Sequence, residues 1–305
     1  MAVLELIMVN KRFGSVEVVK ELSFRVDEHA VFGFLGKNGA GKTTTMKMIL
    51  GFLKADSGEI NVYGEKVVYG NAKTNQYIGY LPDVPEFYGY MTPREYLKLC
   101  GEITGLKGEV LCNRMNEMLE LVGLDGSNRR IRGFSRGMKQ RLGIAQALLN
   151  EPRLLICDEP TSALDPIGRK EILDILAVAK ERTTVVFSTH ILSDVERICD
   201  SVGILNGGKL ALEGKVADIK NTYRKDVVQI ELMKGYPVEA IMTKLKEKSY
   251  VTGLSRQDTC IDIQFSGGEL EARHILGLLS EEQVPLLRYV LLEPSLENVF
   301  LEVVQ

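Results

Sequence analysis

The feature that most constrains this chain is a glycine-rich stretch, Gly36 to Thr43, which fits the pattern G-x-x-x-x-G-K-[ST]. The apolar run Val31 to Leu35 before it predicts a buried strand, and Thr44 to Leu50 after it predicts a helix. A strand, a glycine loop and a helix in this order bind phosphate, because the N–H groups of the loop and of the helix N-terminus point to one place. The sequence therefore predicts a nucleoside triphosphate site in an α/β domain.

The residues of this loop have different expected roles. Lys42 supplies positive charge to the β- and γ-phosphates, and the hydroxyl of Thr43 is an expected ligand of Mg²⁺. The other expected nucleotide-binding positions of the loop are Gly36, Asn38, Gly39, Ala40, Gly41 and Thr44. A glycine-rich turn beside a surface lysine is the alternative, and the flanking strand and helix signals argue against it.

Two adjacent carboxylates, Asp158 and Glu159, follow a second apolar strand, Arg153 to Cys157. Ligands of open α/β sheets collect at the carboxyl ends of the strands, where this pair lies. We expect Asp158 to hold Mg²⁺ through water and Glu159 to polarise the attacking water as general base. A solvated strand end is the alternative interpretation.

The stretch Phe134 to Arg141 resembles the signature motif of the ATP-binding cassette family, and we expect a helix from Leu142 to Leu149 after it. The resemblance covers about residues 1–215. In that family a serine hydroxyl and a glycine N–H of the motif close on the γ-phosphate that a second subunit binds, and Ser135 and Gly137 match these positions. Arg136 and Met138 replace a usual glycine and glutamine. This pattern resembles the bacterial exporter branch whose permeases are separate chains.

Further positions match the family in order along the chain. Ser162 to Asp165 resembles the dimer-contact loop, and His190 resembles the switch histidine, which implies a hydrogen bond to the γ-phosphate and support for Glu159. Phe13 matches the aromatic residue that stacks on adenine. The resemblance thus implies an adenine nucleotide, ATP, as the bound cofactor.

Asp83 marks a departure, because many family members carry at this position the glutamine that touches Mg²⁺ and the attacking water. An aspartate can also bind the metal through oxygen, so we expect a catalytic and metal-binding role for Asp83. The aromatic run Phe87 to Tyr90 lies where family members receive a short helix of the membrane permease. Packing of these rings in a small satellite core is the alternative.

The chain is long enough for two domains, since 305 residues exceed the usual size of one. We expect a P-loop NTPase domain of the ATP-binding cassette type at residues 1–218, with a helical subdomain inserted at about 84–150. The pattern then predicts strand, helix, two strands, helix and strand. This βαββαβ order predicts a small ferredoxin-like α+β domain at residues 219–305 with a regulatory or dimerisation role, or a packing role alone. The expected segments are 226–233, 237–248, 250–255, 260–265, 268–280 and 284–293.

Composition excludes several classes of protein. The start of the chain lacks the pattern of a signal peptide, and no apolar run approaches the ~18–20 residues that span a bilayer. We therefore expect neither a membrane span nor export, and we expect a cytoplasmic location on the membrane face through the permease. The five cysteines predict reduced packing residues, and the three scattered histidines do not predict a zinc site.

The leading functional hypothesis is the ATP-hydrolysing subunit of a membrane transporter, an exporter of a drug, lipid, peptide or ion. One phosphate loop and one signature motif predict a head-to-tail dimer with a second copy or a related subunit, and a permease partner. The alternative is a soluble cassette ATPase acting on nucleic acid or the ribosome; a small-molecule kinase ranks last. The net charge of −3 does not predict nucleic-acid binding. The candidate basic patch is Arg129, Arg130, Arg132, Arg136, Lys139 and Arg141.

Overall fold

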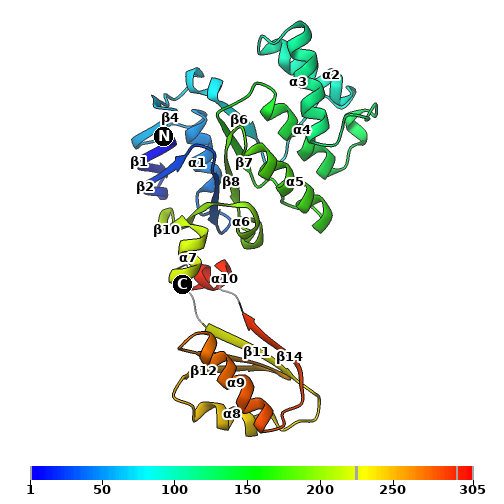
Figure 1. Cartoon of the computed structure of the whole chain (residues 1–305). Helices are drawn as coiled ribbons and strands as arrows, with labels where there is room; N and C mark the ends of the chain where they lie inside the picture. The colour runs from blue at the N-terminus through cyan, green and yellow to red at the C-terminus, as the bar shows by residue number, and fades with distance from the viewer. Residues whose placement is uncertain (1, 224–225, 293–294, 304–305) are drawn as a thin grey trace. The chain divides into compact units, whose positions relative to one another are not determined.

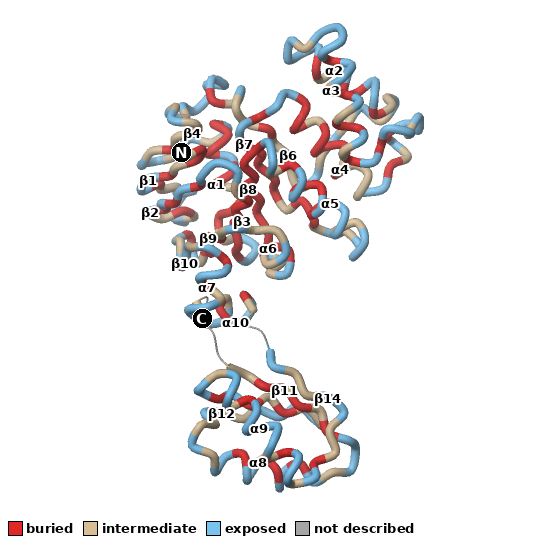
Figure 2. The backbone as a smooth tube through the Cα atoms, viewed as in Figure 1, coloured by how far each residue is buried: buried red, intermediate tan, exposed pale blue. Residues whose placement is uncertain are grey.

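The computed structural model describes residues 2–223, 226–292 and 295–303 and divides into two compact units (Figure 1). The first unit is Met1–Val216 together with Val303–Gln305, and the second is Ala217–Glu302. Each unit has a hydrophobic core of its own, visible as the buried segments in Figure 2.

The first unit is built on a six-stranded sheet with the strand order β10-β9-β3-β8-β7-β6. All neighbouring strands run parallel except β9 and β10, and β3, β7 and β8 are buried along their whole length (Figure 2). The predicted parallel α/β sheet is confirmed, and the loops after β3, β6, β7 and β8 leave the same edge. The strands are β3 (Val31–Gly36), β6 (Ile78–Leu81), β7 (Leu154–Asp158), β8 (Thr184–Thr189), β9 (Ser201–Asn206) and β10 (Lys209–Lys215).

A second, antiparallel sheet of the first unit has the order β2-β1-β4-β5. Its core is shared with the six-stranded sheet, since the Phe24 ring stacks on Phe32 at 5.2 Å and on Phe34 at 5.4 Å between centroids. Helix α1 (Lys42–Ile49) contacts strands of both sheets. The strands are β1 (Ala2–Phe13), β2 (Val16–Asp27), β4 (Ser57–Val62) and β5 (Glu65–Lys66), and the short 3-10 helix η1 (Lys73–Tyr77) leads into β6.

Helices fill the stretch between β6 and β7. They are α2 (Pro93–Ile103), α3 (Gly108–Leu121), the 3-10 turn η2 (Ile131–Gly133) and α4 (Arg136–Leu148). The expected start of the last helix at Leu142, after the signature stretch, is wrong by almost two turns. The helix begins at Arg136 because the Ser135 hydroxyl accepts a hydrogen bond from Met138 N at 3.2 Å and caps it there. Beyond β7, α5 (Pro166–Ala179) and α6 (Leu192–Ile198) pack on β8.

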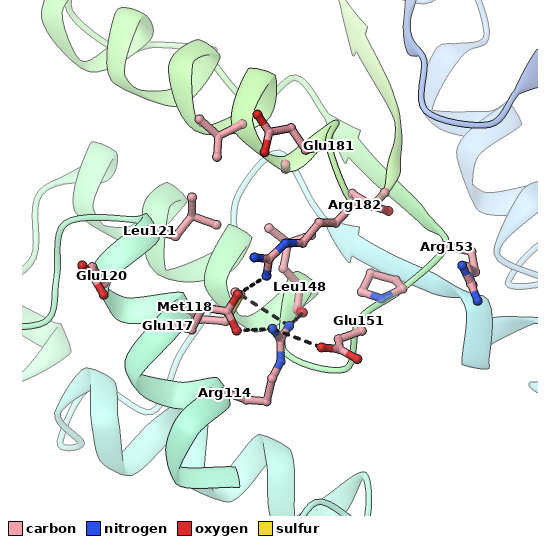
Figure 3. Close-up of a pocket in the computed structure, with 14 residues that line it drawn as sticks. Arg114, Glu117, Met118, Glu120, Leu121, Leu148, Glu151, Arg153, Glu181 and Arg182 are labelled. Atoms are coloured by element: carbon pink, nitrogen blue, oxygen red, sulfur yellow. Dashed lines mark hydrogen bonds and ion pairs between the residues drawn. The ribbon is translucent and has the colours of Figure 1, made fainter. Parts of the chain in front are cut away.

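Arg114 ties the helical stretch together beside a cavity of about 520 Å³ (Figure 3). Its side chain is 12% exposed and donates hydrogen bonds to Leu148 O at 2.8 Å and Leu149 O at 3.2 Å. It also pairs with Glu117, which in turn pairs with Arg182 at the start of the segment before β8. Arg114 therefore satisfies carbonyls at the end of α4 and connects α3 to the sheet-forming part of the unit.

The second unit has the βαββαβ order of the sequence prediction. Its four strands are all paired antiparallel in the order β12-β13-β11-β14, and α8 and α9 pack together with the sheet in one core (Figure 1). The ferredoxin-like fold is confirmed. Its elements are β11 (Asp226–Leu232), α8 (Val238–Lys246), β12 (Val251–Gln257), β13 (Cys260–Phe265), α9 (Glu269–Glu281) and β14 (Leu286–Leu292).

Two helices flank this motif, α7 (Val216–Thr222) before it and α10 (Leu296–Val303) after it. The sequence did not predict α10 as a helix. Residue 293, the last of the expected final strand, lies outside the described residues, as does 294.

The cysteines differ in environment more than the sequence predicts. Cys157 is fully buried in β7, and this burial raises the pKa of its thiol, so it is an inert packing residue as expected. Cys112 is exposed, so its prediction as a packing residue is wrong. Among the described residues, no helix is both long enough and apolar enough to cross a membrane.

Replacing Arg114 with methionine should lower the free energy of unfolding by about 2 kcal/mol, because two carbonyls and the carboxylates of Glu117 and Glu151 lose a charged partner. Arg182→Gln is the matched control, since the Arg182 side chain is 75% exposed and should cost below about 1 kcal/mol. Urea denaturation of both variants measures the difference. Equal losses would contradict the structural role of Arg114.

Candidate nucleotide-binding site

The loops after β3, β6, β7 and β8 and the end of β1 line one cleft of about 570 Å³. The cleft brings together most of the residues that the sequence singled out. Its lining residues are Phe13, Val18, Asn38, Gly39, Gly41, Lys42, Thr43, Thr44, Asp83, Glu159, Ser162 and His190. Gly36 and Ala40 belong to the same loop without lining the cleft.

The phosphate loop leaves the first N–H groups of α1 without a side-chain cap. Gly41 is the N-cap of α1, with φ of +109° and no side-chain hydrogen bond, whereas Thr92, Ser135 and Asp165 cap α2, α4 and α5 with their side chains. A Cβ at Gly41 would lie 2.9 Å from the carbonyl oxygen of Val18, so only glycine fits. The N-terminus of α1 is thus open to an anion.

Lys42 places a buried ammonium at the floor of the cleft. The side chain is only 6% exposed, and its Nζ donates to Gly36 O at 2.6 Å and Lys37 O at 3.3 Å. It also lies 3.2 Å from Oε1 of Glu159. A buried charge is stable only when it is paired, so this lysine is held rigidly for an anionic ligand that approaches α1.

Glu159 stands between two positively charged or polar partners. Its Oε1 faces Lys42, and its Oε2 lies 2.9 Å from Nδ1 of His190. The backbone of Glu159 has φ of +49°, an unusual value for a residue with a side chain, and its N–H donates to Ser188 Oγ at 3.1 Å. The predicted pair Glu159 and His190 is therefore brought into contact, and the strained turn aims the carboxylate into the cleft.

Ser188 is a site residue to which the sequence assigned no role. Its hydroxyl donates to Asp158 Oδ1 at 2.5 Å, because β7 and β8 run parallel with Asp158 opposite Ser188 in register. Asp158 is buried beneath the cleft rather than lining it. The signal for Ser188 in the sequence was its place at the strand end, directly before Thr189 and His190. Recognising Asp158 as its partner also required the register of β7 and β8.

The residues predicted to bind a cation offer only oxygen atoms, which suit Mg²⁺. Thr43 and Asp83 line the cleft, and Asp158 lies behind them with one oxygen engaged by Ser188. Within the described ranges, no three His, Cys, Asp or Glu side chains form a group that can hold a metal ion. A cation at this site therefore needs additional donors, and the phosphates of a nucleotide are suitable.

Phe13 lies at the end of β1, at the cleft, with 48% of its surface exposed. The ammonium of Lys11 lies 5.3 Å from the centre of its ring. An exposed aromatic ring beside a phosphate-binding loop suits the stacking of a planar base. Phe13 thus lines the same cleft as the phosphate loop, and its stacking on adenine stays a prediction.

The signature stretch is not part of this cleft among the described residues. The Ser135 hydroxyl caps α4, and neither Ser135 nor Gly137 lines the cleft, although Ser162 of the expected dimer-contact loop does. Asp165 from the same loop caps α5 by accepting from Gly168 N at 3.0 Å. Ser135 and Gly137 therefore do not line the cleft that contains the phosphate loop of the same chain.

The aromatic run beyond Asp83 borders a second cavity of about 470 Å³. Phe87 packs edge-on against Tyr96 with ring centres 5.0 Å apart, whereas Tyr88 and Tyr90 are 55% and 64% exposed. The alternative of a satellite core therefore fits the half-buried Phe87 best, although the Tyr88 ring also contacts Tyr96 at 6.4 Å between centres.

The basic patch near the signature is partly neutralised. Arg130 pairs with Glu95, Arg136 with Asp83 and Arg141 with Glu171. Ion pairs within the chain reduce the charge that is available to a nucleic-acid backbone, which does not favour the alternative function.

Comparisons with known proteins find a family model for each part of the chain. A family model described as ABC transporter matches residues 19–162, and a model described as the C-terminal domain of DrrA1-3-like ATP-binding proteins matches residues 214–304. The ABC transporter ATP-binding protein YxlF of Bacillus subtilis (strain 168) is 39% identical over 96% of this chain and 97% of its own length. The bacitracin transport ATP-binding protein BcrA of Bacillus licheniformis is 38% identical over 97% of this chain and 95% of its own.

Among solved structures, the ATP-binding subunit of an ABC transporter is 30% identical, with a TM-score of 0.66. The match covers 80% of this chain and 99% of that one.

Replacing Phe13 with alanine should weaken ATP binding about 5- to 30-fold, because the loss of base stacking on an aromatic ring costs about 1–2 kcal/mol. Phe13→Tyr should retain the affinity. Phe52→Ala is the control, since Phe52 is 61% exposed and packs on Tyr80 outside the cleft. Titration with a fluorescent ATP analogue tests this, and an unchanged affinity of Phe13→Ala would remove the stacking role.

Proposed function

Since the chain belongs to the family of ABC transporter ATP-binding proteins and is the ATP-hydrolysing subunit of a membrane transporter, we propose that hydrolysis is carried out by Glu159 in the cleft described above. The observation that carries this proposal is the position of Glu159 between Lys42 and His190, at 3.2 and 2.9 Å. No other described carboxylate is paired with both the phosphate-loop lysine and a histidine.

The proposed chemistry follows from the partners of Glu159. The γ-phosphate of ATP is a stronger partner for Lys42 than a carboxylate, so a bound nucleotide draws the ammonium from Oε1 and frees that oxygen. The freed oxygen then accepts a proton from the attacking water, and His190 keeps the other oxygen in place. The strained backbone of Glu159 and its hydrogen bond to Ser188 keep the carboxylate from swinging away.

We propose that the cation is Mg²⁺ and that it binds together with the nucleotide. Thr43, Asp83 and Asp158, the last through water, are its proposed protein partners, and its charge would stabilise the phosphate oxygens as the bond breaks. The hydrogen bond from Ser188 orients Asp158 for this role.

The proposed active form is a head-to-tail dimer. A lone chain has a phosphate loop in the cleft but no signature residue there, and Ser135 and Gly137 lie at the N-terminus of α4, a suitable anion-binding end. A second copy, or a related subunit, would place its Ser135 and Gly137 against the γ-phosphate of the first. Residues 219–305, which include most of the second unit, are proposed to regulate or assist this pairing.

The proposed partner is an integral-membrane permease that docks on the exposed rings of Tyr88 and Tyr90, on the cytoplasmic side of the membrane. This arrangement would couple the cleft to the membrane, because Asp83 borders both the cleft and the neighbouring cavity. The proposed direction is export, supported by the similarity to BcrA, a bacitracin transport protein. Selection of the substrate belongs to the permease.

Glu159→Gln should bind ATP with nearly unchanged affinity while its ATPase rate falls about 10²- to 10⁴-fold, because the amide cannot act as a base. The variant should also accumulate as an ATP-bound dimer in gel filtration. Glu181→Gln, a change outside the cleft, is the control. Brisk turnover of Glu159→Gln would reject Glu159 as the base.

A dimer that forms equally without residues 219–305 would contradict the role proposed for the second unit.

Purification of Glu159→Gln from native membranes with ATP should yield a multi-span membrane protein. The combined variant with Tyr88→Ala and Tyr90→Ala should recover less of it, while ATP binding is retained. Ribosomes or DNA in place of a membrane protein would contradict the permease partner.

A further inference from the structure

Asp83 and Arg136 form an ion pair that joins the nucleotide cleft to the first turn of α4. Nη2 of Arg136 lies 3.0 Å from Oδ1 of Asp83, with the two side chains 39% and 48% exposed. One turn further along α4, the buried side chain of Gln140 donates its Nε2 to the carbonyl oxygen of Asp83 at 2.6 Å. Helix α4 therefore holds both the side chain and the backbone of Asp83.

The charge of the cleft makes this contact consequential. Two carboxylates, Asp83 and Glu159, line a cleft that receives an anionic triphosphate. Glu159 is compensated by Lys42, whereas the cationic partner of Asp83 among the described residues is Arg136. Without that partner, the carboxylate of Asp83 would repel the phosphates and weaken nucleotide binding.

The identities of the two residues support the same interpretation. Asp83 is acidic and Arg136 is basic, so the charges of the two side chains compensate each other. The positions are 53 residues apart in sequence, and the fold brings them into contact. An acidic side chain at the cleft is thus matched by a basic side chain that can neutralise it.

We propose that Arg136 is a positioning residue for Asp83, which holds and neutralises its carboxylate until a cation that arrives with the nucleotide competes for it. This inference rests on the proposed function of the cleft. It connects occupancy of the cleft to the N-terminus of α4, since release of the Asp83 side chain removes one of the two hydrogen bonds that Arg136 and Gln140 of this helix donate to Asp83.

The test is a double-mutant cycle with Arg136→Gln, Asp83→Asn and the combined variant. Affinity for a trinitrophenyl-ATP analogue is measured by fluorescence, first in EDTA and then with Mg²⁺. In EDTA, Arg136→Gln should weaken binding about three- to fivefold, the effect of an exposed ion pair. The same substitution in the Asp83→Asn background should change the affinity less than about twofold.

Two further readouts separate positioning from a general structural role. With Mg²⁺ the defect of Arg136→Gln should shrink, because the cation then compensates Asp83, whereas a structural defect would persist. Arg136→Lys should restore most of the metal-free affinity. Arg197→Gln is the matched control, because the pair Arg197–Asp174 has a similar length of 2.9 Å and similar exposure of 40% and 55% away from the cleft.

Three outcomes would decide against the proposal. An unchanged metal-free affinity of Arg136→Gln would show that the ion pair does not act on the cleft. An equal loss in the Asp83→Asn background would show that Arg136 acts on a nucleotide directly, and a defect that Mg²⁺ leaves unchanged would show a structural role. Failure of the unsubstituted protein to bind the analogue would instead contradict the function proposed for the cleft.

Discussion

The contact between the buried ammonium of Lys42 and the carboxylate of Glu159 is the interaction on which the site depends. A charge with 6% exposure must find partners inside the protein, and it finds them at the end of β3 and just after β7. The other oxygen of Glu159 meets His190 after β8. These contacts thus join residues at three strand ends, which the parallel order β3-β8-β7 brings close together.

The N-termini of the helices in the first unit differ in whether a side chain caps them. Side chains cap one N–H each at the starts of α2, α4 and α5, whereas α1 begins at Gly41 with no side-chain cap. Since uncapped N–H groups favour an anion, α1 is the end prepared for phosphate. Helix α4 has a second function, because its first turns also hold Asp83 through Arg136 and Gln140. Helix α4 therefore contacts a residue of the chain's own cleft, while its signature residues Ser135 and Gly137 do not line that cleft.

Patterns with a strong local cause were predictable. The phosphate loop, the carboxylate pair Asp158–Glu159 and the strands around them follow from apolar runs and glycine spacing, and the βαββαβ order of the second unit follows from alternating periods. Strand β10 was not predicted, since Lys209–Lys215 alternates exposed and half-buried residues without a buried face. The start of α4 was misplaced because a basic, glycine-containing first turn lacks apolar periodicity, and only the cap of Ser135 marks it.

The sequence by itself determined the chemistry of the site: an ammonium, an uncapped helix start, two carboxylates and a histidine, each adjacent to a strand or helix that its neighbours specify. Only the tertiary structure decided how these groups are paired. Ser188 meets Asp158 through the register of β7 and β8, and Arg136 meets Asp83 because α4 packs against β6. Such pairings depend on the order of strands and the packing of helices, which arise from the whole core, so no local stretch of sequence encodes them.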